Sequence, residues 1–166
     1  KKMYVIEERY RRHIPFYRSS NGGENWEDIL LELIKEYKPK LMICDSAEPE
    51  VIAEYKKAFF KYGCKVEPAD KRGGSVNEGI QIVSLFLHFV HNESTPMLYM
   101  NKDCKELWRQ LATYQWEANG SGKPLKTDDD GPDALRYGLY YLYRELYRKA
   151  KLEIDKDNIK AFNLFG

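Results

Sequence analysis

Hydrophobic residues recur along this chain at two spacings that alternate. Short apolar runs predict buried strands, and apolar residues repeated every three to four positions predict amphipathic helices. Gly, Pro and Asn residues separate these segments. In chain order, the predicted elements are a strand over Met3–Tyr10, a helix from Trp26 to Tyr37, a strand over Leu41–Cys44, a helix from Pro49 to Tyr62, a strand over Cys64–Pro68, a helix from Ser75, a short segment over Met97–Met100, a helix from Lys102 to Gln115 and a helix from Gly131 or Pro132 to about Lys151.

Local signals mark several ends of these elements. Asn25 is a suitable N-cap, with Asp28 three positions later, and Pro39 predicts the end of that helix. Asn101 is the predicted cap of the helix from Lys102. The helix from Ser75 is expected to bury one apolar face, formed by Val76, Ile80, Val83, Leu87 and Val90. The alternation of strands and helices predicts a single α/β domain over residues 1–166.

Composition narrows the classes of protein. The chain has 166 residues, 43% hydrophobic and 32% charged, as in a globular domain with its own core. The net charge is +1, so nucleic-acid binding would have to come from a local basic patch. Its three cysteines form no Cys-x-x-Cys pair, which argues against a disulfide framework and a zinc site. No apolar run approaches the roughly 18 residues needed to span a membrane.

Candidate chemistry begins with an acid at the end of a strand. Asp45 directly follows the apolar run Leu41–Cys44, and open α/β sheets place their sites at the carboxyl ends of strands. A single aspartate there is more often a turn or cap residue. Asp45 is therefore a candidate that needs a second acid beside it.

A second group of acids opens the last predicted helix. Asp130 and Asp133 are three positions apart, so both can face the same side of the helix start, where they could meet Asp45. The alternative is structural, with Asp130 as N-cap and Asp133 at the third helical position. Mg²⁺ prefers several oxygen ligands, and two such ions about 3.5–4 Å apart can hydrolyse a phosphodiester. Acids that converge from a strand and a helix are what such a centre requires.

Four passages together resemble the nuclease domain of the large terminase subunit of tailed bacteriophages. They are LMICDSAEP (Leu41–Pro49), PADKRGGSVNEGI (Pro68–Ile80), the Glu-Leu to Tyr-x-Trp segment Glu106–Trp116, and DGPDALRY (Asp130–Tyr137). The last passage is the most specific, and the others gain weight from their order. The resemblance spans roughly Tyr4 to Leu146.

The resemblance implies a ribonuclease H-like fold, with a mixed central sheet flanked by helices. It implies an endonuclease, dependent on Mg²⁺ or Mn²⁺ at a two-metal site, that cuts concatemeric viral DNA during packaging in the cytoplasm of the bacterial host. An N-terminal ATPase, a portal protein and a small terminase subunit would be its partners. Asp45 and Asp133 match two of the family's acids, and Asp130 stands where many members have an auxiliary ligand.

One acid of the family pattern has no match in this sequence. The family's first acid lies on a first strand, in a Val-Asp-x-Gly-like passage that is absent here. Glu7 and Glu8 lie in the first predicted strand but in the wrong context. We therefore expect a fragment of a longer protein that lacks its first strand and one metal ligand, with weakened metal binding and a nuclease that could be inactive as it stands.

Basic residues near these acids are candidates for DNA contact. Lys71 and Arg72 precede the helix from Ser75, and Lys123 and Lys126 flank the acidic loop. Such side chains can hold phosphates, although solvated loops are the commoner explanation. Two alternatives remain open: another ribonuclease H-like nuclease, such as a resolvase or transposase relative, and a non-catalytic domain that docks to portal or DNA.

Overall fold

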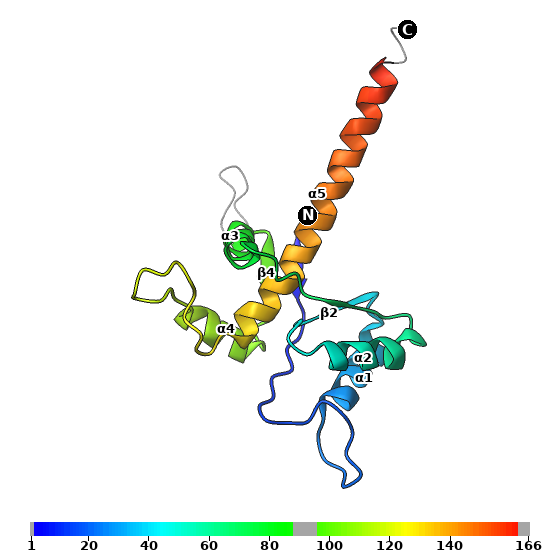
Figure 1. The fold of residues 1–166 in the computed structure, drawn as a ribbon, viewed down its shortest axis with the longest axis vertical. Coiled ribbons are helices and arrows are strands. Elements are labelled where there is room, and N and C mark those ends of the chain that lie inside the picture. Colours follow the sequence, from blue (N-terminus) through cyan, green and yellow to red (C-terminus); the bar gives the residue numbers. More distant parts are fainter. Residues whose placement is uncertain (1, 88–95, 163–166) are drawn as a thin grey trace.

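The computed structural model describes residues 2–87 and 96–162. Strands and helices alternate through most of this part of the chain (Figure 1). The elements are β1 (Met3–Val5), α1 (Trp26–Tyr37), β2 (Leu41–Cys44), α2 (Pro49–Phe60), β3 (Lys65–Pro68), α3 (Ser75–Leu87), β4 (Leu98–Met100), α4 (Lys105–Thr113) and α5 (Asp130–Phe162). The predicted α/β class is confirmed.

The strands pair as two separate parallel sheets. β1 pairs with β4, with Tyr4 opposite Tyr99, and β2 pairs with β3, with Met42 opposite Val66. Parallel pairs need a crossover connection, and helices supply it in both sheets. The resemblance implies one mixed central sheet, whereas the described strands form these two parallel pairs.

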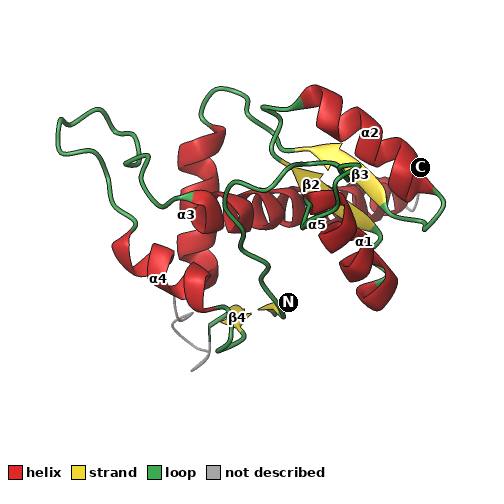
Figure 2. Ribbon diagram, turned by 90° about the horizontal axis from the view of Figure 1, so that it is seen from below, coloured by secondary structure: helices red, strands yellow, loops and turns green. Residues whose placement is uncertain are grey.

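The first hydrophobic core lies between the β2–β3 pair and helices α1 and α2, which lie together beside these strands in Figure 2. Ile34 from α1 and Phe59 from α2 are each 1% exposed and meet Val66 of β3 in this core. Helix α1 begins as predicted, because the Asn25 side chain accepts a hydrogen bond from the Asp28 N–H at 2.9 Å. The core holds β2, and with it Asp45, in place.

The second core lies between the β1–β4 pair and helices α3 and α5. Phe86 of α3, Leu98 of β4 and Leu139 of α5 are buried in it. In Figure 1, α5 runs diagonally between α3 and α4 on one side and β2, α1 and α2 on the other. Because of this position, the start of α5 can meet residues from both sides.

The inward face of α3 differs from the prediction. Its buried residues are Ser75, Gly79, Ile82 and Phe86, whereas Leu87 is exposed, the other described members of the predicted face are only partly buried, and Val90 lies outside the described residues. The reason is a close approach of α5: a Cβ at Gly79 would lie 2.5 Å from Cγ of Arg136. Packing against a large side chain on another helix therefore sets the buried face of α3.

Several predicted boundaries differ from the structure. The first strand ends at Val5 instead of Tyr10, and α4 begins at Lys105 instead of Lys102. The cause at α4 is remote, because Glu8 accepts hydrogen bonds from the first-turn N–H groups of Glu106 and Leu107, both at 2.8 Å. Helix α5 begins at Asp130 and continues to Phe162, beyond the predicted end.

Candidate active site

Asp45 leaves the end of β2 and is held by a local turn. Its Oδ1 accepts the Ala47 N–H at 2.8 Å, and the Lys71 ammonium forms an ion pair with the same oxygen. The Asp45 side chain is 49% exposed, so solvent reaches it. The turn explanation and the functional one are therefore compatible at this residue.

Asp133 reaches Asp45 through a shared tyrosine. Tyr137 lies one turn after Asp133 on α5, and its hydroxyl lies 3.0 Å from Oδ2 of Asp45 and 3.4 Å from Oδ2 of Asp133. Two carboxylates from distant parts of the chain thus lie within two hydrogen-bond lengths of each other. We call Asp45 and Asp133 the acid pair.

Basic side chains compensate the charge on the α5 side of this pair. Lys126 lies 2.9 Å from Asp129 and 3.2 Å from Asp133, and the guanidinium of Arg136 lies 2.9 Å from the other oxygen of Asp133. Asp129 and Asp133 are largely buried, with side chains 18% and 15% exposed. Asp129 is therefore a third acid close to the pair, linked to it through Lys126.

These contacts change the pKa values of the site. Partial burial opposes ionisation of Asp45, but hydrogen bonds from Lys71, Ala47 and Tyr137 outweigh it and lower the pKa of that carboxyl. Burial, followed by the negative charges of Asp133 and Asp45, raises the pKa of the Tyr137 hydroxyl. The hydrogen bond to Asp129 raises the pKa of Lys126. At neutral pH Asp45 is therefore ionised, Lys126 is charged and Tyr137 is a neutral phenol.

Several buried polar atoms in this region lack a hydrogen-bond partner. They are the Ser75 hydroxyl, the Tyr114 hydroxyl, Oδ1 of Asp133 and Nε of Arg136. Buried polar groups are normally satisfied, so unsatisfied ones indicate a place for water or an ion. Two of these atoms lie at the candidate site, but Oδ1 of Asp133 is already ion-paired with Nη2 of Arg136 at 2.9 Å.

The acid pair offers the type of ligand that a hard cation prefers, but it offers few ligands. Carboxylate and hydroxyl oxygens are the ligand type that Mg²⁺ takes, and one or two carboxylates with water suffice for one ion. Among the side chains that the structure describes, no three of His, Cys, Asp or Glu lie close enough together to hold an ion. These residues therefore fit one hard cation, and a two-metal centre would need further ligands.

The remaining predicted site residues lie at different distances from the pair. The Asp130 carboxylate accepts a hydrogen bond from the Tyr10 hydroxyl at 3.2 Å. Lys71 and Lys126 contact the acids, whereas Arg72 pairs with Asp70 at 2.6 Å. Lys123 is exposed in the loop before α5.

Glu7 and Glu8, the acids of the predicted first strand, make contacts away from the acid pair. Both carboxylate oxygens of Glu8 accept backbone N–H groups of α4. Glu7 pairs with Arg9 and accepts a hydrogen bond from the Tyr37 hydroxyl, each at 2.5 Å. Neither is placed with the acid pair.

Sequence reasoning missed Tyr137, Asp129 and Gln110. Tyr137 follows Asp133 by four positions, which is one helical turn, and that spacing could have identified it. Gln110 is fully buried; its Oε1 accepts the Gly131 N–H at 2.7 Å and its Nε2 donates to Glu106 at 3.0 Å. It fixes the start of α5, and nothing in its local sequence indicates that role.

No protein-family model matches this chain, and comparisons with curated proteins and with solved structures also found no match. No helix in the part of the chain that the structure describes is both long and apolar enough to cross a membrane. The site must therefore be interpreted from its own geometry and from the sequence resemblance.

Proposed function

We propose that this chain is a metal-dependent DNA endonuclease domain whose centre is the acid pair. The observation that supports this most is the Tyr137 hydroxyl, which lies within hydrogen-bond distance of both carboxylates. Two acids from a strand end and a helix start meet there, as hydrolysis of a phosphodiester by hard cations requires. Oδ1 of Asp133 is held by the Arg136 guanidinium at 2.9 Å, so a cation would bind Asp133 through Oδ2.

Each side chain would have a distinct task. Asp45 and Asp133 would hold Mg²⁺ or Mn²⁺, which supplies Lewis-acid polarisation of the phosphate and a more acidic water. Lys71 and Lys126 each hold a carboxylate and can offer a positive charge to an incoming phosphate. Tyr137 orients the two carboxylates by donating its proton to one of them at a time.

The wider assignment is also a proposal. The resemblance supports a ribonuclease H-like nuclease domain of a viral packaging terminase that acts on double-stranded DNA in the host cytoplasm, with an ATPase, a portal protein and a small terminase subunit as partners. A ribonuclease H-like sheet would require the β1–β4 and β2–β3 pairs to be joined into one.

Substitution of the acid pair tests the proposal. Asp45→Asn and Asp133→Asn keep size and remove the charge, so both should abolish nicking of supercoiled DNA in Mg²⁺ or Mn²⁺, in this chain and in a full-length protein that contains it. Asp103→Asn is the matched control, because Asp103 is exposed in the turn before α4. Cleavage by Asp45→Asn at the wild-type rate would refute the proposed site.

A second candidate is a domain that binds DNA or a partner protein without cutting. It is favoured by the ion pairs, since Lys71 and Lys126 already neutralise the two acids. In that case Asp45→Asn would leave DNA binding intact, and the wild-type chain would not nick DNA with either metal ion.

A further inference from the structure

Arg136 of α5 is a charged side chain in the interior of the protein. Its side chain is 5% exposed, and its guanidinium lies 2.9 Å from the Asp133 carboxylate, three positions earlier on the same helix. Ion pairs at this spacing commonly lie on the surface of a helix, where both charges keep their water. A buried pair loses that hydration, and the attraction between the charges does not always compensate for the loss. Stability alone therefore does not explain why this pair is buried.

The Arg136 guanidinium also leaves one of its donors unused. Among the groups that the structure describes, its buried Nε has no hydrogen-bond partner, and an unused donor of this kind lowers stability. The guanidinium carbon lies 4.6 Å from the centre of the Tyr137 ring, within the range of a cation–π contact. Arg136 thus contacts one acid of the acid pair and also the tyrosine that joins the two acids.

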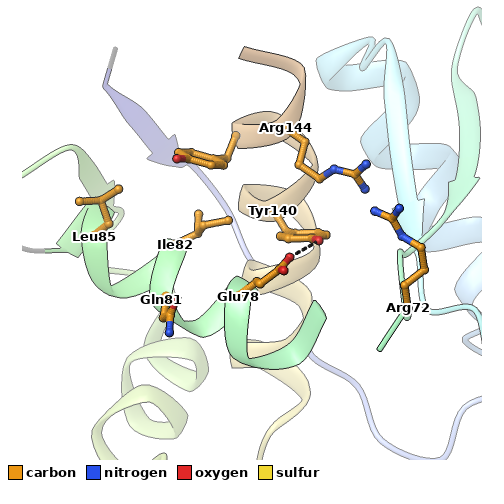
Figure 3. A pocket seen from close by; sticks show the side chains of 8 residues that line it. Arg72, Glu78, Gln81, Ile82, Leu85, Tyr140 and Arg144 are labelled. Carbon is orange, nitrogen blue, oxygen red and sulfur yellow. Dashed lines mark hydrogen bonds between the residues drawn. The ribbon is translucent and has the colours of Figure 1, made fainter. Parts of the chain in front are cut away.

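Helix α3 makes room for Arg136 at Gly79. A Cβ at this position would lie 2.5 Å from Cγ and 2.9 Å from Cδ of Arg136, so that side chain would have to move. The close approach is fixed beside Gly79, because the Tyr140 hydroxyl of α5 donates a hydrogen bond to Glu78 at 2.7 Å (Figure 3). Glycine inside a helix is less stable than alanine. The space for Arg136 is therefore obtained with a residue that is unfavourable for α3.

Three unfavourable features therefore meet at one arginine: a charge removed from water, an unused donor and a glycine inside a helix. Departures of this kind from the most stable arrangement are concentrated at functional sites. We propose that Arg136 is a positioning residue, which Gly79 admits and which holds the Asp133 carboxylate in the orientation that the acid pair requires. The inference rests on the proposed nuclease function, because the role that it assigns lies within that site.

The position of Arg136 gives this role a distinctive signature. Nη2 of Arg136 occupies Oδ1 of Asp133, while Oδ2 of Asp133 lies 3.4 Å from the Tyr137 hydroxyl and 3.2 Å from Lys126. Without Arg136, both oxygens of Asp133 would be free for a cation, and one nearby positive charge would be gone. Loss of Arg136 should therefore slow cleavage without weakening metal binding. Loss of a residue that only stabilises the fold would weaken both.

Arg136→Ala and Gly79→Ala test this role. The rate of nicking at saturating Mn²⁺ would be measured in this chain or in a full-length protein that contains it. Electron paramagnetic resonance of free Mn²⁺, in a titration of this chain without DNA, gives the affinity for the ion. We expect each variant to lower the rate about 10- to 100-fold, as loss of a group that orients a metal ligand does. The dissociation constant for Mn²⁺ should stay the same or decrease.

The double variant shows whether Gly79 acts through Arg136. In the Arg136→Ala background, a Cβ at position 79 no longer meets Cγ or Cδ, so Gly79→Ala should cause no further loss of rate. It should raise the melting temperature in EDTA, because alanine is the better helix former. Losses that multiply in the double variant would overturn the coupling between the two positions. Gly79→Ala keeps every charged side chain, so it carries the test even if Arg136→Ala does not fold.

Two controls on α5 match these substitutions. Gly138→Ala adds a methyl group where a Cβ would meet no described atom beyond its own stretch of helix within 4 Å. Arg144→Ala removes an arginine that is 48% exposed and ion-paired with Asp70. Both controls should cleave DNA at the wild-type rate. If Arg136→Ala and Gly79→Ala match them, or lose rate only in proportion to weaker Mn²⁺ binding, Arg136 does not position Asp133.

The positioning role and the nuclease function can fail separately. A wild-type protein that neither binds Mn²⁺ nor nicks DNA, or an Asp45→Asn variant that cleaves at the wild-type rate, would refute the nuclease site and with it the role of Arg136. Loss of cleavage in Asp45→Asn together with wild-type cleavage in Arg136→Ala would refute the positioning role alone.

Discussion

The Tyr137→Phe substitution removes only the hydroxyl that joins the acid pair. The hydroxyl has one proton, so although it contacts Asp45 at 3.0 Å and Asp133 at 3.4 Å, it can donate to one carboxylate at a time. A hydrogen bond to a charged group contributes about 1.5–3 kcal/mol to stability. Because the Asp45 side chain is 49% exposed, water can replace part of this contact, and we expect the lower end of that range.

A loss of about 1.5 kcal/mol should lower the melting temperature of a chain of this size by about 3–6 °C. Circular dichroism melts in EDTA would measure it without any contribution from metal binding. A second measurement addresses the site directly. Without the tyrosine donor, the pKa of Asp45 should rise toward its ordinary value, so the acid limb of the pH profile of DNA cleavage should move to higher pH.

Tyr141→Phe is the matched control. Tyr141 lies on the same helix and lines a cleft beside β2 and β3, whereas the hydroxyl that contacts the acid pair belongs to Tyr137. We expect its melting temperature and pH profile to match the wild type. If Tyr137→Phe is indistinguishable from Tyr141→Phe in both measurements, the hydroxyl does not join the two carboxylates.

Two further predictions concern stability. Gln110→Ala leaves the Gly131 N–H without its acceptor and opens a small cavity, so the free energy of unfolding in a urea titration should fall by about 2–3 kcal/mol. Acid should also destabilise the fold. The pKa values of Asp45, Asp70 and Asp128 are lowered in the folded chain, so below pH 4 the unfolded state binds more protons, and melting temperatures that are level above pH 5 should fall.

Each of these predictions has a control or a contrary outcome. Gln115→Ala changes an exposed glutamine just after α4 and should alter stability by less than about 0.5 kcal/mol. An equal loss in both glutamine variants would mean that the contact with Gly131 does not hold the start of α5. Equal melting temperatures at pH 7 and pH 3 would contradict the assigned carboxylate contacts.

Much of the fold could be predicted because its signals are local. The Asn25 cap, the apolar run before Asp45 and the proline at the start of α2 each act within a few residues. The predictions were wrong where a residue far away in the sequence sets the buried face or the start of a helix. Arg136 selects the buried face of α3 at Gly79, and Glu8 caps α4 from 98 residues earlier in the chain.

The same distinction applies to the site. Asp45 and Asp133 could be paired from the order of the motifs, but the choice between Asp129 and Asp130 depends on where α5 begins. Because the helix begins at Asp130, that side chain meets Tyr10, while Asp129 shares Lys126 with Asp133. A shift of one residue at a helix start rotates each side chain by about 100°, which sequence patterns do not resolve.

The acid pair lies across the boundary between two hydrophobic cores. Asp45 is fixed to the core around Phe59, and Asp133 is fixed to the helix that packs against the core around Leu98. A small rotation of one half against the other would widen the gap between the carboxylates while both cores stayed intact. A cation bound by both Asp45 and Asp133 would bridge the two halves of the domain. The two halves would then unfold together.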